Sequence, residues 1–117
     1  MLFNYKIISK NFCKDKGELK LLTHIFLDGK MDVFNGHFND FPLLPAVAQL
    51  YFVEKIAKAQ ITVLGKFEGM SQVKFMAPIL PNNTVILKLN YDLNKKTLKF
   101  EYELDKKIKS KGLIKYN

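Results

Sequence analysis

His37 is the residue in this sequence best suited to proton transfer. It lies between Gly36 and Phe38 in the stretch Met31–Leu44, whose Asn-Gly and Asn-Asp pairs predict a shaped loop. Imidazole is the only side chain whose unperturbed pKa lies near neutrality, so it can act as a base at physiological pH. Gly36 lets the backbone turn tightly, and Phe38 can shield the ring from water.

A helix is predicted directly after this loop, over Ala46–Ile61. Pro45 suits the first turn, where its missing N–H is not needed, and no Gly or Pro interrupts the following residues. A helix start presents unpaired N–H groups and a positive dipole end, which can hold a developing negative charge. Further along, Tyr51 carries a phenol that can donate a hydrogen bond. Glu54 either stays in a solvated i,i+4 pair with Lys58 or reaches back toward a pocket.

The other reactive side chains show no pattern of a metal or nucleophilic site. His24 alternates with charged residues on a predicted strand, so we expect it to be exposed. Cys13 has no basic neighbour at a helix start and is interpreted as structural or incidental. Asp40 follows His37 by three residues and either orients that ring, caps the helix region or is simply exposed. With two His and one Cys, no metal-ligand spacing occurs, and we expect neither a metal nor another cofactor.

The pattern of apolar residues predicts one sheet and one helix. Residues 97–104 alternate cleanly between apolar and polar side chains, and sequential strands joined by short turns pair antiparallel with one face in water. Residues 46–53 are apolar on nearly every side, with only Gln49 interrupting, so we expect this end of the helix to be buried. The predicted fold class is α+β, with an antiparallel sheet wrapped around one long central helix.

The predicted strands are Leu2–Ser9, Glu18–Asp28, Gly69–Met76, Thr84–Tyr91, Thr97–Leu104 and Lys107–Tyr116. Between the first two, Asn11–Gly17 is polar and holds a Lys-Gly turn signal, so it is interpreted as a turn segment.

Length and composition indicate one small domain over residues 1–117. The chain is 48% apolar and 26% charged, which supports a core of its own and excludes disorder and fibrous classes. Its single Cys cannot form an intrachain disulfide. No apolar run approaches the length of a membrane span, and Met1–Lys10 lacks the features of a signal peptide. We therefore expect a soluble, cytoplasmic protein with no membrane partner.

The positive charge is uneven along the chain. All 19 basic residues are Lys, with eight Lys and six acids in residues 1–62 against eleven Lys and five acids in residues 63–117. Base readout and bidentate phosphate contacts rely on Arg, which is absent, so specific nucleic-acid binding is not expected. The basic half is either a solvated lysine surface or a surface that attracts an acidic carrier protein.

Two sequence blocks resemble the hotdog-fold 3-hydroxyacyl thioester dehydratases. Residues 34–50 (FNGHFNDFPLLPAVAQL) resemble the family's F-x-G-H-F-P-x-x-P-[VIL]-[ML]-P-G-V signature, and residues 74–85 (KFMAPILPNNTV) resemble its K-F-x-x-P-V-x-P-G-D-x-L turn. The Ala-Gln-Leu continuation is most similar to the small dehydratases of aryl-polyene-type clusters. The resemblance implies a homodimer, with two sheets joined edge to edge and an acyl tunnel at the interface.

The resemblance also implies roles for individual residues. His37 takes a proton from the carbon next to the thioester carbonyl, and the backbone N–H of Ala46, at the family's Gly position, polarises that carbonyl. Gly36, Phe38, Pro45 and Val47 are the further substrate-binding candidates. The family's carboxylic acid lies fourteen positions after the His, where this sequence has Tyr51. A phenol is a much weaker proton donor than a carboxylic acid, so Tyr51 and Glu54 are both candidates for the acid.

Three functions follow as hypotheses. The first is a dehydratase acting on a 3-hydroxyacyl thioester, carried by acyl carrier protein or CoA, in fatty-acid or polyene-type biosynthesis. The second is an acyl thioesterase, in which Glu54 or Asp40 activates water. The third is a non-catalytic acyl-binding module or pseudoenzyme subunit that partners an active hotdog chain, a class favoured by the missing helix carboxylate.

Overall fold

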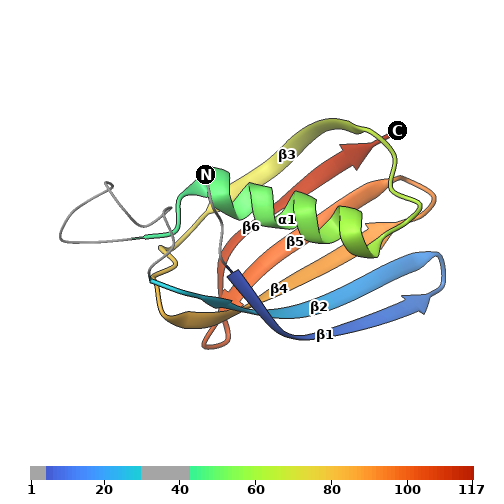
Figure 1. Ribbon diagram of the computed structural model, residues 1–117. Coiled ribbons are helices and arrows are strands. Elements are labelled where there is room, and N and C mark those ends of the chain that lie inside the picture. The colour runs from blue at the N-terminus through green and yellow to red at the C-terminus, as the bar shows by residue number, and fades with distance from the viewer. Residues whose placement is uncertain (1–4, 30–42) are drawn as a thin grey trace.

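The computed structural model describes residues 5–29 and 43–117, with the backbone alone for residues 5, 6 and 8–12. Within these residues the chain forms six strands and one helix (Figure 1). In chain order they are β1 (Tyr5–Asp15), β2 (Glu18–Leu27), α1 (Ala46–Gln60), β3 (Phe67–Phe75), β4 (Asn83–Asp92), β5 (Thr97–Leu104) and β6 (Lys107–Tyr116).

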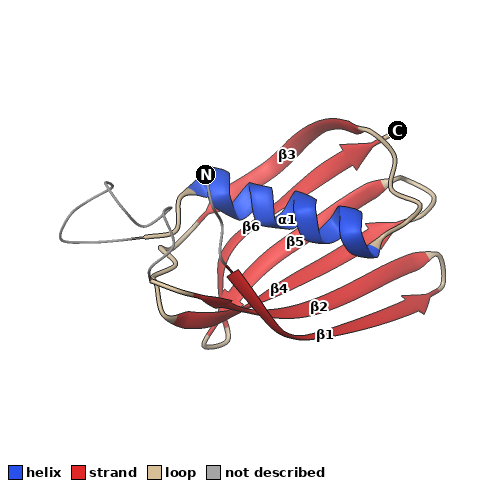
Figure 2. Ribbon diagram, in the orientation of Figure 1, coloured by secondary structure: helices blue, strands red, loops and turns tan. Residues whose placement is uncertain are grey.

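All six strands belong to one sheet, in the order β1-β2-β4-β5-β6-β3, and every neighbouring pair is antiparallel. The helix α1 lies across one face of this sheet, and β1 and β3 form its two edges (Figure 2). This arrangement confirms the predicted α+β class, an antiparallel sheet around a single helix. Within residues 5–29 and 43–117, no helix has the length and apolar character that a membrane span requires.

Strict alternation in the central strands builds the core. In β2 and β4 every second side chain is buried, because successive residues of a strand point to opposite faces of the sheet. The buried set of these strands faces the buried flank of α1, which is formed by residues spaced three and four apart. The largest fully buried side chains are Tyr91, Tyr102, Tyr116, Phe52, Phe100, Ile25, Leu27, Leu44, Ile61, Ile79 and Leu87.

The first hairpin differs from the prediction made from the sequence. The interpretation of Asn11–Gly17 as a turn segment was wrong for residues 11–15, which continue β1 and pair with β2 up to Asp15 opposite Glu18. Only Lys16 and Gly17 form the turn, both with positive φ (46° and 80°), as a two-residue hairpin of favourable twist requires. Backbone pairing with β2 outweighs the weak preference of these polar residues for a strand. The other elements agree with their predicted bounds to within two residues.

The burial of α1 is one-sided. Ala48, Phe52 and Val53 are fully buried, whereas Val47 is 66% exposed and Tyr51 is 41% exposed. The expectation that the first two turns are buried on every side was therefore wrong for one flank. The reason is geometric, because a single sheet supports only the side of the helix that rests on it.

Two tyrosines from the sheet attach α1 by hydrogen bonds. The hydroxyl of Tyr102 on β5 donates to the main-chain oxygen of Gln49 at 2.6 Å, and the hydroxyl of Tyr116 on β6 donates to the carboxylate of Glu54. Burial and this bond to Glu54 raise the pKa of Tyr116 well above its ordinary value of 10.0. Desolvation also raises the pKa of Tyr91, beside Tyr116.

We expect Thr23→Val to stabilise the protein. Thr23 on β2 is completely buried, and its Oγ1 has no hydrogen-bond partner among the described residues. An unpaired buried hydroxyl costs roughly 1 kcal/mol, and Val has the same shape without it. The free energy of unfolding, measured by urea titration, should therefore rise by about 1 kcal/mol. A loss of stability would show that this hydroxyl has a partner in the folded protein.

The stability of the protein should fall at alkaline pH, and Tyr116→Phe should weaken that dependence. A group whose folded pKa is raised contributes stability that is complete below its unfolded value and is lost as pH rises beyond it. Urea midpoints measured from pH 8 upward should therefore decline above about pH 10 in the wild type. The variant should show a shallower decline, since the raised pKa of Tyr91 remains. Equal slopes in the two proteins would contradict the assignment to Tyr116.

Candidate functional site

The start of α1 opens onto a cavity of about 370 Å³. Residues from both family-like sequence blocks line it, which places these two distant segments of the chain against each other. Its lining is largely apolar and consists of Leu43, Leu44, Ala46, Gln49, Phe75, Met76, Ala77 and Pro78. An apolar ligand such as an acyl chain suits this lining better than a charged molecule does.

The first turn of the helix has no side-chain cap among the described residues. Pro45 is the N-cap residue, in an extended conformation, and its carbonyl accepts hydrogen bonds from the N–H groups of Ala48 and Gln49 at 3.1 Å. The first turn of the helix holds no acidic residue. In the part of the chain that the structure describes, the N–H groups of Ala46 and Val47 have no partner. These two donors can therefore hold an oxygen that becomes negatively charged.

A second cavity, of about 640 Å³, lies along the exposed flank of α1 and reaches Met70 on β3. Of these two cavities on α1, the one at the helix start is called the smaller cavity and this one the larger cavity. Tyr51 and Glu54, the two candidate acids, both line it. The Tyr51 ring packs edge-on against Phe52, with ring centroids 6.2 Å apart, and the Lys55 ammonium lies 5.7 Å from the Tyr51 centroid. The fold therefore brings Tyr51 and Glu54 to one wall of the same hollow.

Glu54 is engaged on two sides. Its carboxylate accepts the hydrogen bond from the Tyr116 hydroxyl, and its other oxygen lies 3.4 Å from the Lys58 ammonium. The predicted i,i+4 pair with Lys58 is thus present, but the Glu54 side chain is only 23% exposed and also reaches into the sheet. Use of Glu54 as an acid or base requires this carboxylate to give up or share these partners.

The loop with the proposed base lies outside the described residues. Gly36, His37, Phe38 and Asp40 all belong to residues 30–42. Their roles therefore remain predictions from the sequence. The described chain resumes at Leu43, at the rim of the smaller cavity.

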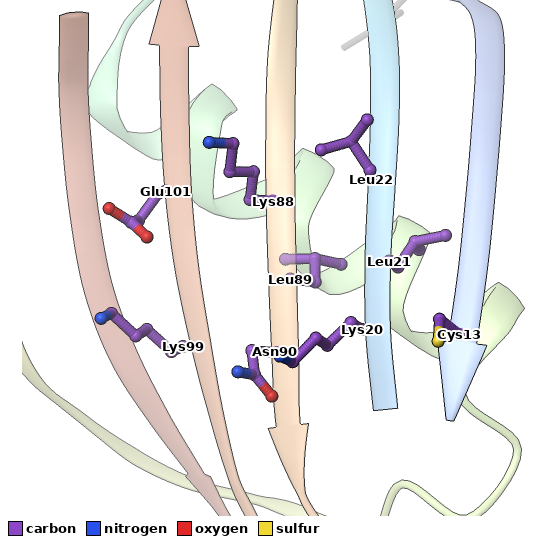
Figure 3. A pocket seen from close by; sticks show the side chains of 9 residues that line it. All are labelled: Cys13, Lys20, Leu21, Leu22, Lys88, Leu89, Asn90, Lys99 and Glu101. Atoms are coloured by element: carbon purple, nitrogen blue, oxygen red, sulfur yellow. The ribbon is translucent and has the colours of Figure 1, made fainter. Parts of the chain in front are cut away.

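The open face of the sheet holds a third hollow, of about 330 Å³. Figure 3 shows Lys20, Lys88, Lys99 and Glu101 on this side of the strands, with the helix behind the sheet. Lys88 pairs with Glu103 at 3.4 Å, which neutralises part of this charge. Cys13 at its edge is an exposed free thiol. His24 on the same strand as Lys20 is half-buried rather than fully exposed as expected, because neighbouring strands flank it on both sides.

The first residues of β6 lie next to the segment after β3 that lines the smaller cavity. The main-chain oxygen of Lys109 accepts hydrogen bonds from the N–H groups of Met76 and Ala77, at 2.8 and 3.1 Å, and both of these residues line that cavity. Lys106 in the β5–β6 turn and Lys107, the first residue of β6, are exposed. Lys95 and Lys96 lie in the β4–β5 turn at the opposite end of β5.

Gln49 is a polar residue of the site that the sequence analysis did not single out as functional. It lines the smaller cavity, is 4% exposed, and has its amide bonded on both sides. The available signal was its position as the lone polar residue in an apolar stretch of the helix. No cluster of His, Cys, Asp and Glu suited to a metal ion occurs among the residues that the structure describes.

Comparison with known proteins identifies the family. Residues 13–113 match the model of the ApeI-like family, described as ApeI dehydratase. The dehydratase heterocomplex ApeI:P from Xenorhabdus doucetiae has a chain that is 35% identical, with 94% of this chain and 95% of that chain covered and a TM-score of 0.83. An uncharacterized protein from Erwinia carotovora subsp. atroseptica is 32% identical over 98% of this chain and 95% of its own, with a TM-score of 0.86. No match was found among curated proteins.

The family match, over residues 13–113, includes the helix start and the residues that line both cavities, and the two solved relatives cover nearly all of the chain. The chain is therefore a member of the ApeI-like dehydratase family and has the hotdog fold.

Proposed function

We propose that this protein dehydrates a 3-hydroxyacyl thioester to the enoyl thioester, with His37 as the base. The observation that carries the proposal is the cavity at the start of α1, lined by residues of both family-like blocks. Ala46 lines this cavity, so an acyl thioester placed there would have its carbonyl at the start of α1, where the N–H groups of Ala46 and Val47 have no partner among the described residues. The membership in a dehydratase family supports the same reaction class.

In this reaction His37 removes a proton from the carbon next to the carbonyl. The negative charge that develops on the carbonyl oxygen is held by the amides of Ala46 and Val47. The electron pair of the broken C–H bond then forms the carbon–carbon double bond, and the hydroxyl on the next carbon leaves as water after it takes up a proton. The apolar lining keeps other water away from the reacting atoms.

The proton for the leaving hydroxyl comes from Tyr51 in this proposal. Tyr51 occupies the sequence position of the family's acid and faces the larger cavity, while the carboxylate of Glu54 is held by Tyr116 and Lys58. Tyr51 lies on the exposed flank of α1, so the site it serves is completed by another subunit. Glu54 is the second candidate for the acid, and it would have to donate its proton while it is hydrogen-bonded to Tyr116.

We infer that the protein works as a dimer through the face that contains β3. Phe67, Met70 and Phe75 on this edge strand are 48%, 39% and 46% exposed, next to the exposed Val47 and Tyr51 of α1. An edge strand also offers unpaired backbone groups to a second sheet. A second copy of this chain, joined edge to edge, would cover these side chains.

A second candidate function is that of a subunit that binds the acyl chain and leaves the acid to a different partner. Two observations favour it: the phenol of Tyr51 stands where the family has a carboxylate, and the relative from Xenorhabdus doucetiae is a heterocomplex. In that case the face with β3 takes a different hotdog chain.

The test follows the absorbance of the enoyl thioester when purified protein meets a 3-hydroxyacyl thioester on a carrier protein. Loss of a general base lowers the rate by roughly 100-fold or more, so His37→Ala should nearly abolish turnover. Tyr51→Phe, which keeps the ring, should lower kcat by roughly 10- to 100-fold if the phenol supplies the proton. Glu54→Gln is the matched variant at the neighbouring candidate and should have the smaller effect.

Undiminished turnover by His37→Ala would refute the proposed base. No turnover by the wild type at any chain length, with the acyl chain still bound, would favour the second candidate function. Release of free thiol without enoyl product, lost in Glu54→Gln, would instead indicate a thioesterase.

The exposed lysines around the start of β6 should assist binding of an acidic carrier. Replacing both Lys106 and Lys107 with Gln removes two exposed charges, each worth roughly 0.5 kcal/mol, so KM for a carrier-linked substrate should rise about five-fold. The matched variant at Lys95 and Lys96 carries the same charge change at the other end of β5 and should leave KM unaltered. The difference should shrink at high salt and vanish for a small thioester without a carrier. An equal rise in KM for the Lys106/Lys107 and Lys95/Lys96 variants would refute a specific role of Lys106 and Lys107 in carrier binding.

A further inference from the structure

A fourth hollow, of about 320 Å³, lies on the open face of the sheet, where β5, β6 and β3 are neighbours. Lys99 identifies the face, because the residues before and after it in β5 are completely buried and successive side chains of a strand point to opposite faces. Figure 3 shows the Lys99 side chain on the open side of the sheet, extended away from Asn90 of β4 and therefore toward β6. The lining of this lysine hollow consists of Gln72, Lys74, Lys99, Lys111, Gly112 and Leu113.

Three lysines from three neighbouring strands line the lysine hollow. Lys74 and Lys111 are directly opposite each other in the antiparallel pairing of β3 with β6. Lys99 is paired with Leu113, one diagonal step from Lys111. Long side chains in such positions are within reach of one another, and like charges directly opposite each other destabilise a sheet.

The surrounding residues leave this positive charge largely uncompensated. None of the three lysines forms an ion pair with a carboxylate in the part of the chain that the structure describes. Glu101 is opposite Lys111 in the pairing of β5 with β6, but its side chain lines the neighbouring third hollow and makes no ion pair with Lys111. A bound anion would therefore relieve the repulsion among the three lysines.

An irregularity in β3 brings Lys74 to this face. Between the pairs that Ser71 and Lys74 form with β6, β3 has two residues and β6 has only one, which is a β-bulge. The first bulged residue, Gln72, has a φ of 55°, a conformation that residues with a side chain seldom adopt. Because side chains alternate between faces, the extra residue moves Lys74 from the helix face to the open face. The bulge thus creates the opposition of Lys74 and Lys111.

The chemistry of the lining favours a phosphate ester. Three lysines carry more charge than one carboxylate neutralises, whereas a phosphate monoester carries close to two negative charges at neutral pH. Lysine binds phosphate as a point charge with three donors and does not need the planar geometry of arginine. Leu113 adds an apolar side chain, against which the carbon part of an ester can pack. The volume of the hollow is that of a site for a small ligand.

We propose that the lysine hollow binds the phosphate group of a small phosphorylated molecule, held by Lys74, Lys99 and Lys111. The two cavities on α1 lie on the other face of the sheet, so this site does not depend on the proposed dehydration. A second copy joined edge to edge at β3 leaves the site accessible, because such pairing uses the backbone groups of the strand and not the open face of the sheet.

The test titrates the isotope-labelled full chain with phenyl phosphate at constant ionic strength and follows the backbone amides by NMR. The amide shifts of Gln72, Gly112 and Leu113 should saturate with a Kd of about 1 mM, as expected for three charge-assisted contacts. Lys99→Gln and Lys111→Gln should each weaken binding roughly ten-fold, since each removes one such contact. The absence of a saturable shift at these amides would refute the site.

Lys88→Gln is the matched control. It makes the same charge change on the same face of the sheet, but Lys88 is paired with Glu103 and lies outside the lysine hollow. At physiological ionic strength we expect it to change the Kd by no more than about two-fold, because distant exposed charges are screened. An equal loss of affinity in Lys88→Gln and Lys111→Gln would show only a general attraction by the positive face, and the proposal would be wrong.

Inorganic phosphate distinguishes an ester site from a site for the free anion. At about pH 8.5 both probes are largely dianions, and phenyl phosphate should bind roughly five-fold more tightly because its ring covers apolar surface of Leu113. Leu113→Ser should remove this advantage. Equal affinities of the two probes in the wild type would overturn the assignment to an ester. Tighter binding of an acidic peptide than of phenyl phosphate, with the same loss in Lys111→Gln, would instead assign the hollow to a protein partner.

Discussion

The sheet covers α1 along one flank only, and the rest of the molecule follows from this constraint. The buried flank, with Phe52 and Val53, rests on the alternating apolar residues of the central strands. The other flank keeps Val47 and Tyr51 in contact with solvent, although the helix is apolar there as well. An apolar flank with a large hollow beside it is a surface that a second subunit would cover, and the proposed acid lies on this surface.

Polar atoms inside the core fix the helix along its length. Tyr102 and Tyr116 bind it at Gln49 and Glu54 respectively, about 1.4 turns apart along the helix. Ser110 adds a bond to the Gln49 side chain. Apolar contacts alone allow a helix to slide or rotate on a sheet at small cost, whereas a buried hydrogen bond is lost by a shift of about 1 Å. These bonds therefore give the helix start a defined position relative to the strands.

The proposed site is divided between parts of the protein with different degrees of constraint. The amides of Ala46 and Val47 belong to a rigid helix, and the cavity beside them is closed by the turn after β3. The candidate acids stand on the outer flank of the same helix, where Glu54 is already bonded and Tyr51 faces the larger hollow.

Much of the architecture follows from the sequence alone, because it depends on neighbours in the chain. Pro45 marks the helix start, the alternation in residues 97–104 defines a strand, and two short blocks indicate the dehydratase family. The state of the site residues depends instead on tertiary contacts. Ser110 meets Gln49 and Tyr116 meets Glu54 across 61 and 62 residues of sequence, and the sheet leaves Tyr51 uncovered. Local sequence patterns do not predict these contacts, because hydrogen bonds between distant segments form only when the fold brings those segments together.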